Sequence, residues 1–236
     1  MCTVTWTHQP DGYHLLCNRD ERLTRGPAVA PGVFERGATR FVSPADADYG
    51  GTWIAVNEYG LGLCLLNGPD RQLPHGGGSR GFVIPELIRL RSIDDCAFAL
   101  HRFDLAPFAP FTLLMLEPGR PASVAAWDGA ALAVDADADR HAPLVSSSFD
   151  LEGVRRSRSH EFARRAPADP ASLYRFHASH GGGDGSPYSP CMHRADAETV
   201  SFSWVVVNGD EVRFLYLPAA PCRCTPGAQS ILARAA

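Results

Sequence analysis

The chain begins with MCTVTWTHQPDGYHLLCNRDER, residues 1–22. Apolar and polar residues alternate over residues 2–7 and 13–17, which is typical of β-strands with one buried face. The QPDG segment between these runs contains a Pro and a Gly, and both suit a tight turn. The sequence therefore predicts an N-terminal hairpin, with Cys2 opening its first strand and the polar segment CNRDER ending its second.

The rest of the chain continues with hairpins and pairs of helices. TWIAVN (52–57) and LGLCLL (61–66) are apolar runs around a short turn, which predicts a second hairpin. Apolar residues follow helical spacing over residues 81–102, and a second helix is expected to start at Ser92. Further strands are predicted at 111–117, 122–127, 130–134, 143–147, 199–207 and 211–217, and further helices at 153–166 and 170–179. This order is not that of a parallel βαβ protein and predicts an α+β fold, with antiparallel sheets between helix layers.

The composition indicates a globular protein with a small-molecule partner. The chain has 236 residues, of which 45% are hydrophobic, enough for a sizeable core in a single domain spanning residues 1–236. Its 22 basic and 26 acidic residues give a net charge of −4, so no strong field favours nucleic acid or an anionic membrane. No apolar run is long enough to cross a bilayer, and we expect no transmembrane segment.

The absence of lysine excludes several kinds of chemistry. All 22 basic residues are arginine, so Schiff-base catalysis, a phosphate-binding P-loop and a Ser-Lys hydrolase site are ruled out. The seven cysteines are an odd number spread along the chain, which indicates reduced thiols rather than a disulfide framework. Because the N-terminal residues also do not form a secretion signal, we expect a cytoplasmic protein.

Cys2 is the strongest candidate for a catalytic residue. A Met that precedes a small residue is usually removed by an aminopeptidase, and removal of Met1 would give Cys2 a free α-amine. A thiol with an ordinary pKa of about 8.5 is already nucleophilic, and an amine with a pKa of about 7.7–8.0 can accept its proton. A lone cysteine is more often a small buried hydrophobe. Cys2 stands at the start of a strand, where its amine would lie at a sheet edge, and this position favours a role as nucleophile.

Two polar residues at strand ends are candidates for supporting Cys2. Asp20 lies where the first hairpin returns to the level of Cys2, so its carboxylate could hold a neighbouring amine or thiol. Asn67 ends the apolar run LGLCLL, and its amide could donate to an oxyanion. The structural alternatives are a solvated strand end for Asp20 and a turn-forming Asn before Gly68-Pro69.

A metal site is a third possibility, carried by Cys191, His193, Cys222 and Cys224. The one-residue spacings in Cys191-Met192-His193 and Cys222-Arg223-Cys224 differ from those of ordinary zinc knuckles, whose paired ligands are two to four residues apart. We therefore expect no metal and no other cofactor.

Several segments together resemble a known family. MCTVTW, CNRDER at 17–22, GGTW at 50–53 and the Asn-ended strand resemble the NRDE family, named after residues 18–21, which includes the transport and Golgi organisation 2 (TANGO2) proteins. The first third of the chain matches well, and SSSF at 146–149 and CMHR at 191–194 are similar to bacterial members. The family is similar to penicillin V acylases and bile salt hydrolases. The resemblance implies their four-layer αββα fold, that of the N-terminal-nucleophile hydrolases.

The resemblance also implies roles for individual residues. By it, Cys2 is the nucleophile, Asp20 the acid that positions it, and Asn67 the oxyanion donor. Where the acylases have a second oxyanion Asn, this chain offers Ser146 or Ser147. Possible substrate or electrostatic roles fall to Asn18, Arg19 and His193. Arg19 matches less directly, because the acylases carry an Arg three residues before their Asp and that place here is Cys17.

These inferences lead to a functional hypothesis. We expect a cysteine amidohydrolase that cleaves a linear amide of a small molecule, with Cys2 attacking after Met1 has been removed. The alternative is a non-catalytic protein that binds a lipid, haem-like or other small ligand in the same cleft. Retention of Met1 would favour the alternative, because the extra residue blocks the base.

Overall fold

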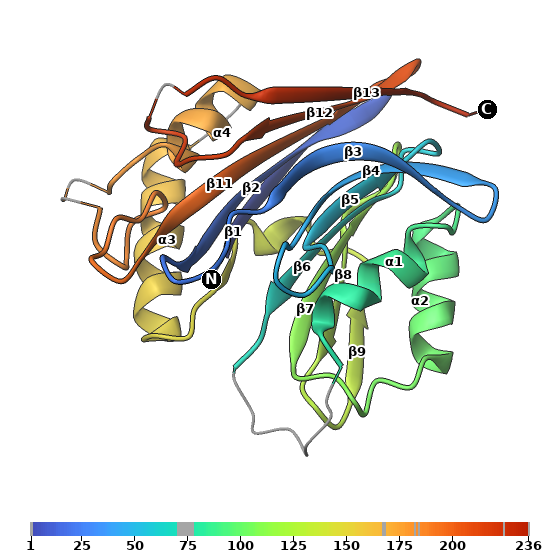
Figure 1. Ribbon diagram of the computed structural model, residues 1–236, viewed down its shortest axis with the longest axis horizontal. Helices are drawn as coiled ribbons and strands as arrows, with labels where there is room; N and C mark the ends of the chain where they lie inside the picture. The colour runs from blue at the N-terminus through green and yellow to red at the C-terminus, as the bar shows by residue number, and fades with distance from the viewer. Residues whose placement is uncertain are drawn as a thin grey trace.

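A computed structural model describes residues 2–69, 78–166, 169–181, 183, 185–223 and 225–235. Within these residues the chain forms two antiparallel sheets packed face to face, with helices on the two outer faces (Figure 1). The predicted α+β fold with four layers in the order αββα is therefore confirmed. None of the described helices is both long and apolar enough to span a bilayer.

The first sheet contains the N-terminal hairpin. Its six strands are, in spatial order, β10 (Leu144–Ser146), β1 (Cys2–Gln9), β2 (Gly12–Arg22), β11 (Ala197–Val207), β12 (Glu211–Leu217) and β13 (Ala228–Ala233). Strand β1 thus lies between its hairpin partner and a strand from the middle of the chain, so that Cys2 pairs with Arg19 on one side and Ser146 on the other. This arrangement places the first residues of the chain inside a sheet.

The second sheet contains the second predicted hairpin. Its seven strands are β3 (Val29–Arg36), β4 (Thr39–Ala45), β5 (Ile54–Asn57), β6 (Gly62–Asn67), β7 (Phe111–Leu116), β8 (Ser123–Trp127) and β9 (Leu132–Asp135), in that spatial order. Each strand pairs with the next one in the sequence, so this sheet is a meander. Asn67 at the end of β6 reaches the same end of the molecule as Cys2.

The core between the sheets follows the alternation seen in the sequence. Successive strand residues point to opposite faces, so Leu15 packs between the sheets while Leu16 packs under the helices. The thiols of Cys2, Cys17 and Cys64 all belong to the cluster between the sheets. By the same alternation, Leu16, Asn18 and Asp20 point toward the helical layer.

Helices cover both outer faces. Helices α3 (Leu151–Arg165) and α4 (Pro170–His177) lie on the first sheet, and α1 (Val83–Leu87) and α2 (Ile93–Arg102) lie on the second (Figure 1). Ser92 caps α2, since its side chain accepts a hydrogen bond from the backbone N–H of Asp95, as the sequence predicted. Short 3₁₀ turns occur at Arg80–Phe82 and Asp139–His141.

Three strands were not predicted. The last predicted strand is 211–217, but β13 follows it in the structure, and β3 and β4 have no predicted counterpart. Both β3 and β13 are edge strands with mostly exposed side chains. An edge strand buries too little apolar surface to produce a strong alternation in the sequence.

Candidate active site

A cavity of about 380 Å³ opens where the ends of β1, β2 and β6 meet. Its walls include Cys2, Asp20 and Asn67, the three residues predicted to act together. Arg19 and Trp53 also line it. The cavity is thus shared by the two sheets, with Cys2 and Asp20 on the first sheet and Asn67 on the second.

Cys2 is held at the cavity wall by its two neighbouring strands. Cys2 is only 7% exposed, and its backbone nitrogen donates a hydrogen bond of 3.0 Å to the Oγ of Ser146. Ser146 was predicted as a possible oxyanion residue. Its hydroxyl instead lies against the nitrogen that would become the α-amine of a chain starting at Cys2.

The surroundings of the Cys2 thiol disfavour its ionised form. A hydrogen bond with the thiol of Cys17 and burial raise the pKa of Cys2 well above its ordinary value, and the charge of Asp20 adds a smaller effect in the same direction. A thiol in this position is a poor nucleophile unless a base removes its proton as it reacts. In a chain that begins at Cys2, the nitrogen of this residue is an α-amine and can act as that base.

Asp20 forms a fully buried ion pair with an arginine from α3. The NH1 of Arg158 lies 3.0 Å from Oδ2 of Asp20, and both side chains are 0% exposed. Oδ1 accepts a 2.7 Å hydrogen bond from Thr199. The pairing of β11 with β2 shifts by one residue between Thr199 and Ser201, and this bulge lies opposite Asp20. The carboxylate is therefore fixed from two sides.

Arg158 is a site residue that sequence reasoning missed. Besides Asp20, its guanidinium donates hydrogen bonds to the Oγ1 of Thr3 and to the carbonyl of Pro187 at 3.2 Å. The sequence pattern that could have identified Arg158 is its place in a helix. Val154, Arg158 and Phe162 follow one another at four-residue spacing on the inward face of α3. A charged residue in an inward-facing row requires a buried partner.

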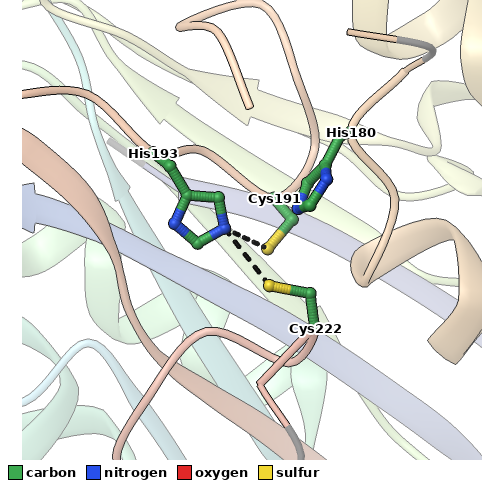
Figure 2. A group of neighbouring side chains, drawn as sticks. All are labelled: His180, Cys191, His193 and Cys222. Carbon is green, nitrogen blue, oxygen red and sulfur yellow. Dashed lines mark hydrogen bonds between the residues drawn. The ribbon is translucent and has the colours of Figure 1, made fainter. Parts of the chain in front are cut away.

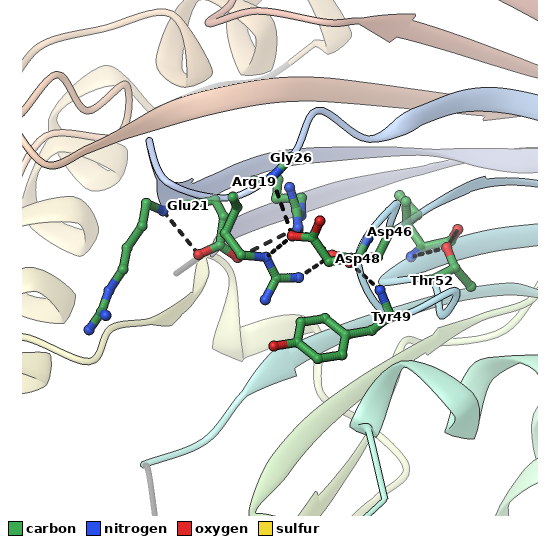
Figure 3. A network of polar contacts seen from close by, with 10 residues as sticks. Arg19, Glu21, Gly26, Asp46, Asp48, Tyr49 and Thr52 are labelled. Atoms are coloured by element: carbon green, nitrogen blue, oxygen red, sulfur yellow. Dashed lines mark hydrogen bonds and ion pairs between the residues drawn. The ribbon is translucent and has the colours of Figure 1, made fainter.

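Arg19 belongs to a polar network at the mouth of the cavity (Figure 3). Its NH2 lies 2.7 Å from Oδ2 of Asp46, which also binds Arg25 at 2.5 Å. The guanidinium of Arg19 lies 4.5 Å from the ring centre of Trp53. Asp46 in turn accepts the backbone N–H of Tyr49, so the loop after β4 is tied to β2. Arg19 thus faces the cavity, as its predicted electrostatic role requires.

Asn67 is the only exposed residue of β6. Its strand position is fixed by pairing with Phe111 and, one residue later, by the backbone hydrogen bond from Gly68 to Pro110. The side chain lines the cavity. An amide at this position can donate to a negatively charged oxygen that forms in front of Cys2.

Four predicted residues are absent from the described lining of the cavity: Ser146, whose contact with Cys2 is given above, and Asn18, Ser147 and His193. Asn18 is buried under the helices, where its amide donates to the carbonyls of His177 and Pro190. The Oγ of Ser147 accepts the backbone N–H of Phe149. His193 lies in a separate cluster of cysteine and histidine side chains. Asn18 therefore ties β2 to the helical layer instead of facing a substrate.

His177 makes the stability of the fold dependent on pH. Burial, together with the charge of Arg158, lowers the pKa of its imidazole to about 3. The unfolded chain therefore binds a proton that the folded chain does not, and stability falls as pH drops below about 6.5. We expect a loss of about 2 kcal/mol between neutral pH and pH 5 from this group. Urea unfolding at both pH values measures it, and His177→Gln should lose this part of the pH dependence. An identical dependence in both proteins would contradict the assignment.

Comparisons with known proteins identify the family and the fold. The family model for Transport and Golgi organisation 2 matches residues 1–131, which include Cys2, Asp20 and Asn67. No curated protein matches the sequence.

Solved structures with the same fold include three amide hydrolases. A penicillin V acylase from Agrobacterium tumefaciens has 11% identity and a TM-score of 0.62, covering 93% of this chain and 83% of that one. A Caenorhabditis elegans orthologue of N-acylethanolamine-hydrolyzing acid amidase has 16% identity and a TM-score of 0.59, covering 98% and 100%. The C2A mutant of a conjugated bile acid hydrolase from Clostridium perfringens has 11% identity and a TM-score of 0.55, covering 100% and 97%. At such low identities the similarity establishes the fold alone, and it confirms the predicted αββα fold.

Proposed function

Because the chain belongs to the Transport and Golgi organisation 2 family and has the N-terminal-nucleophile fold, we propose that it is a cysteine amidohydrolase acting on a small linear amide. The observation that carries the proposal is the arrangement around Cys2. Cys2, Asp20 and Asn67 line one cavity, and the Cys2 nitrogen lies on the hydroxyl of Ser146. In this proposal the protein works in the cytoplasm, where its thiols stay reduced.

The reaction begins once Met1 has been removed. The α-amine of Cys2 accepts the thiol proton while Ser146 accepts a hydrogen bond from that amine and keeps its lone pair directed at the sulfur. The sulfur attacks the amide carbonyl and forms a tetrahedral intermediate, whose oxyanion receives a hydrogen bond from Asn67. The C–N bond then breaks, the proton passes from the α-amine to the leaving nitrogen, and a thioester remains on Cys2. Water attacks the thioester, the same amine accepts the proton of that water and returns it to the sulfur, and the acid is released.

Asp20 acts as a positioning residue in this mechanism. Its carboxylate is bound by Arg158 and Thr199, and the same arginine donates to Thr3, the residue after the nucleophile. These bonds connect the start of β1 with the end of β2. They fix the direction in which Cys2 points, and accurate positioning of a nucleophile can account for a large part of a rate enhancement.

The cavity favours an amide with one apolar and one polar end. Trp53 and Leu65 supply apolar surface, while Arg19 and Arg80 supply guanidinium groups to the same wall. A volume of about 380 Å³ suits a small molecule. The similar structures are named for a penicillin, a conjugated bile acid and an N-acylethanolamine, and this supports a small amide as the substrate class.

Covalent trapping tests the proposal. Purified protein is incubated with an activated acyl ester and with a panel of N-acyl amides, and intact-mass spectrometry follows the products. We expect a chain that lacks Met1 and carries one acyl group on Cys2. Cys2→Ala should give no adduct, whereas Cys96→Ala, which removes a buried thiol on α2, should be labelled normally. Asn67→Ala should acylate about 10²–10³-fold more slowly, because it lacks an oxyanion donor. Equal labelling of wild type and Cys2→Ala would disprove the proposal.

A second candidate is a protein that binds a lipid-like or haem-like ligand in this cavity without catalysis. The burial of Cys2 and the raised pKa of its thiol favour this reading, because both disfavour a reactive thiolate. It predicts a chain that retains Met1 by intact mass, and ligand binding that Cys2→Ala leaves unchanged.

A further inference from the structure

Four side chains with metal-binding atoms meet outside the cavity. His180 follows α4, Cys191 and His193 lie in the segment before β11, and Cys222 lies in the turn after β12. One donor atom from each lies within 4.8 Å of all the others. In Figure 2 the two histidines lie on either side of Cys191, and one ring nitrogen of His193 points at both sulfurs.

The separations between these atoms fit a tetrahedral ion. Zinc lies about 2.3 Å from cysteine sulfur and about 2.0 Å from histidine nitrogen, so neighbouring donors in a tetrahedron are about 3.3–3.8 Å apart. Nε2 of His193 lies 3.6 Å from the sulfur of Cys191 and 3.2 Å from the sulfur of Cys222. Small side-chain movements would bring all four donors to these separations.

His180 contributes a buried nitrogen that needs a partner. Its Nε2 is buried and has no hydrogen-bond partner among the described residues. Its ring lies edge-on to that of His193, with centres 5.1 Å apart. Buried polar atoms are rarely left without a partner, so this nitrogen beside two thiols is well placed to bind a metal.

A carboxylate lies behind His193, as expected for a histidine that binds a metal. Nδ1 of His193 is 3.5 Å from Oε2 of Glu198, on the side of the ring opposite the sulfurs. Arg223 holds the same carboxylate at 2.5 Å. A carboxylate on the second nitrogen fixes the ring and leaves the first nitrogen unprotonated for the metal.

We propose that His180, Cys191, His193 and Cys222 form a structural zinc site. Two thiolates and two imidazoles are the donor set of a closed tetrahedral zinc centre, in which no position remains for a substrate. Binding would release the two thiol protons to solvent. Spacing along the chain can identify only ligands that are close in sequence, whereas these four ligands come from three separate segments. It replaces Cys224, which lies outside the described residues, with His180.

The ion would also support the proposed active site. Met192 lies between two of the ligands, and its carbonyl accepts a 2.9 Å hydrogen bond from the backbone N–H of Thr199. Its own N–H donates a 2.9 Å hydrogen bond to the Thr199 hydroxyl. The same Thr199 hydroxyl donates to Asp20 at 2.7 Å. Zinc would therefore hold the segment that fixes the carboxylate behind Cys2.

The test is a metal analysis of the full chain, expressed without a histidine tag and purified without chelators. We expect one zinc per chain by elemental analysis, and almost none in the double variant Cys191→Ser/Cys222→Ser. Cys96→Ala, which removes a thiol on the opposite side of the molecule, should keep its zinc. Removing zinc from wild type should lower the midpoint of thermal unfolding, and adding it back should restore the midpoint.

Cobalt substitution provides a second measurement if the double variant fails to fold. Cobalt bound to wild type should give thiolate-to-metal charge transfer and the intense visible bands of a tetrahedral ion. The proposal is overturned if reduced, folded wild type binds no zinc, if the double variant keeps one zinc, or if iron or copper binds these ligands in preference. It is also overturned if Cys191 and Cys222 form a disulfide and zinc does not bind after reduction.

Discussion

From the proposed mechanism, we expect a chain with one alanine inserted between Met1 and Cys2 to hydrolyse amides about 10²–10⁴-fold more slowly than wild type, the contribution typical of a positioned acid–base group. After Met1 is removed, this chain starts with the inserted alanine, so the Cys2 nitrogen is an amide and cannot accept a proton. The thiol and its neighbours Cys17 and Ser146 are unchanged in sequence. Steady-state kinetics on the best amide of the panel measures the loss, and N-terminal mass confirms the extra residue.

Two controls separate the missing base from a disturbed fold. Urea unfolding of the extended chain should match wild type within about 0.5 kcal/mol, because every residue from Cys2 onward is unchanged. After unfolding in urea, an alkylating reagent should modify Cys2 in the extended chain as it does in wild type, whereas in Cys2→Ala this position cannot react. Full activity of the extended chain would show that the α-amine is not the base.

Replacing Arg158 with methionine should destabilise the fold by about 3–5 kcal/mol, the usual cost of removing one partner of a buried ion pair. Methionine fills much of the same space, but it leaves the carboxylate of Asp20 buried without its 3.0 Å counterion. Urea unfolding at neutral pH measures the change. Arg155→Met on the exposed face of the same helix should cost less than about 1 kcal/mol, because its pair with Glu152 is solvated.

The double variant Arg158→Met/Asp20→Asn separates stability from catalysis. Asparagine carries no charge, so the double variant should regain a large part of the stability lost by Arg158→Met. Its activity should remain low, because neither the carboxylate nor the guanidinium is present to position Cys2. If the double variant is as unstable as the single one, the pairing of Asp20 with Arg158 does not explain the loss.

The sequence predicts most of the fold and the main residues of the candidate site. The hairpins of β1 with β2 and of β5 with β6 follow from apolar alternation interrupted by turn residues. Cys2, Asp20 and Asn67 were candidates because they fall at strand ends, and the resemblance to the NRDE family then singled them out. A strand's register determines which side chains share an edge. The structure brings these three residues to one cavity.

The features that the sequence does not reveal depend on distant contacts. Arg158 lies 138 positions from Asp20 along the chain, and nothing local identifies it as that residue's partner. The cluster around His193 likewise combines three segments of the chain. Cys191 and His193 lie in one of them, and His180 and Cys222 lie in the other two. Strands β3 and β13 were missed because their exposed positions weaken the alternation. Local patterns record which face of an element is buried, but not which element covers it.

The place of β1 in its sheet has a consequence for how the protein is made. Ser146 on β10, which holds the Cys2 nitrogen, follows Cys2 by 144 positions. At about 5–20 residues per second, a ribosome needs about 7–30 s to synthesise that interval. Throughout this time the first strand has no partner on its β10 side, so its first residues stay accessible to an aminopeptidase. The order of synthesis thus leaves a window for trimming the N-terminus before the sheet closes over it.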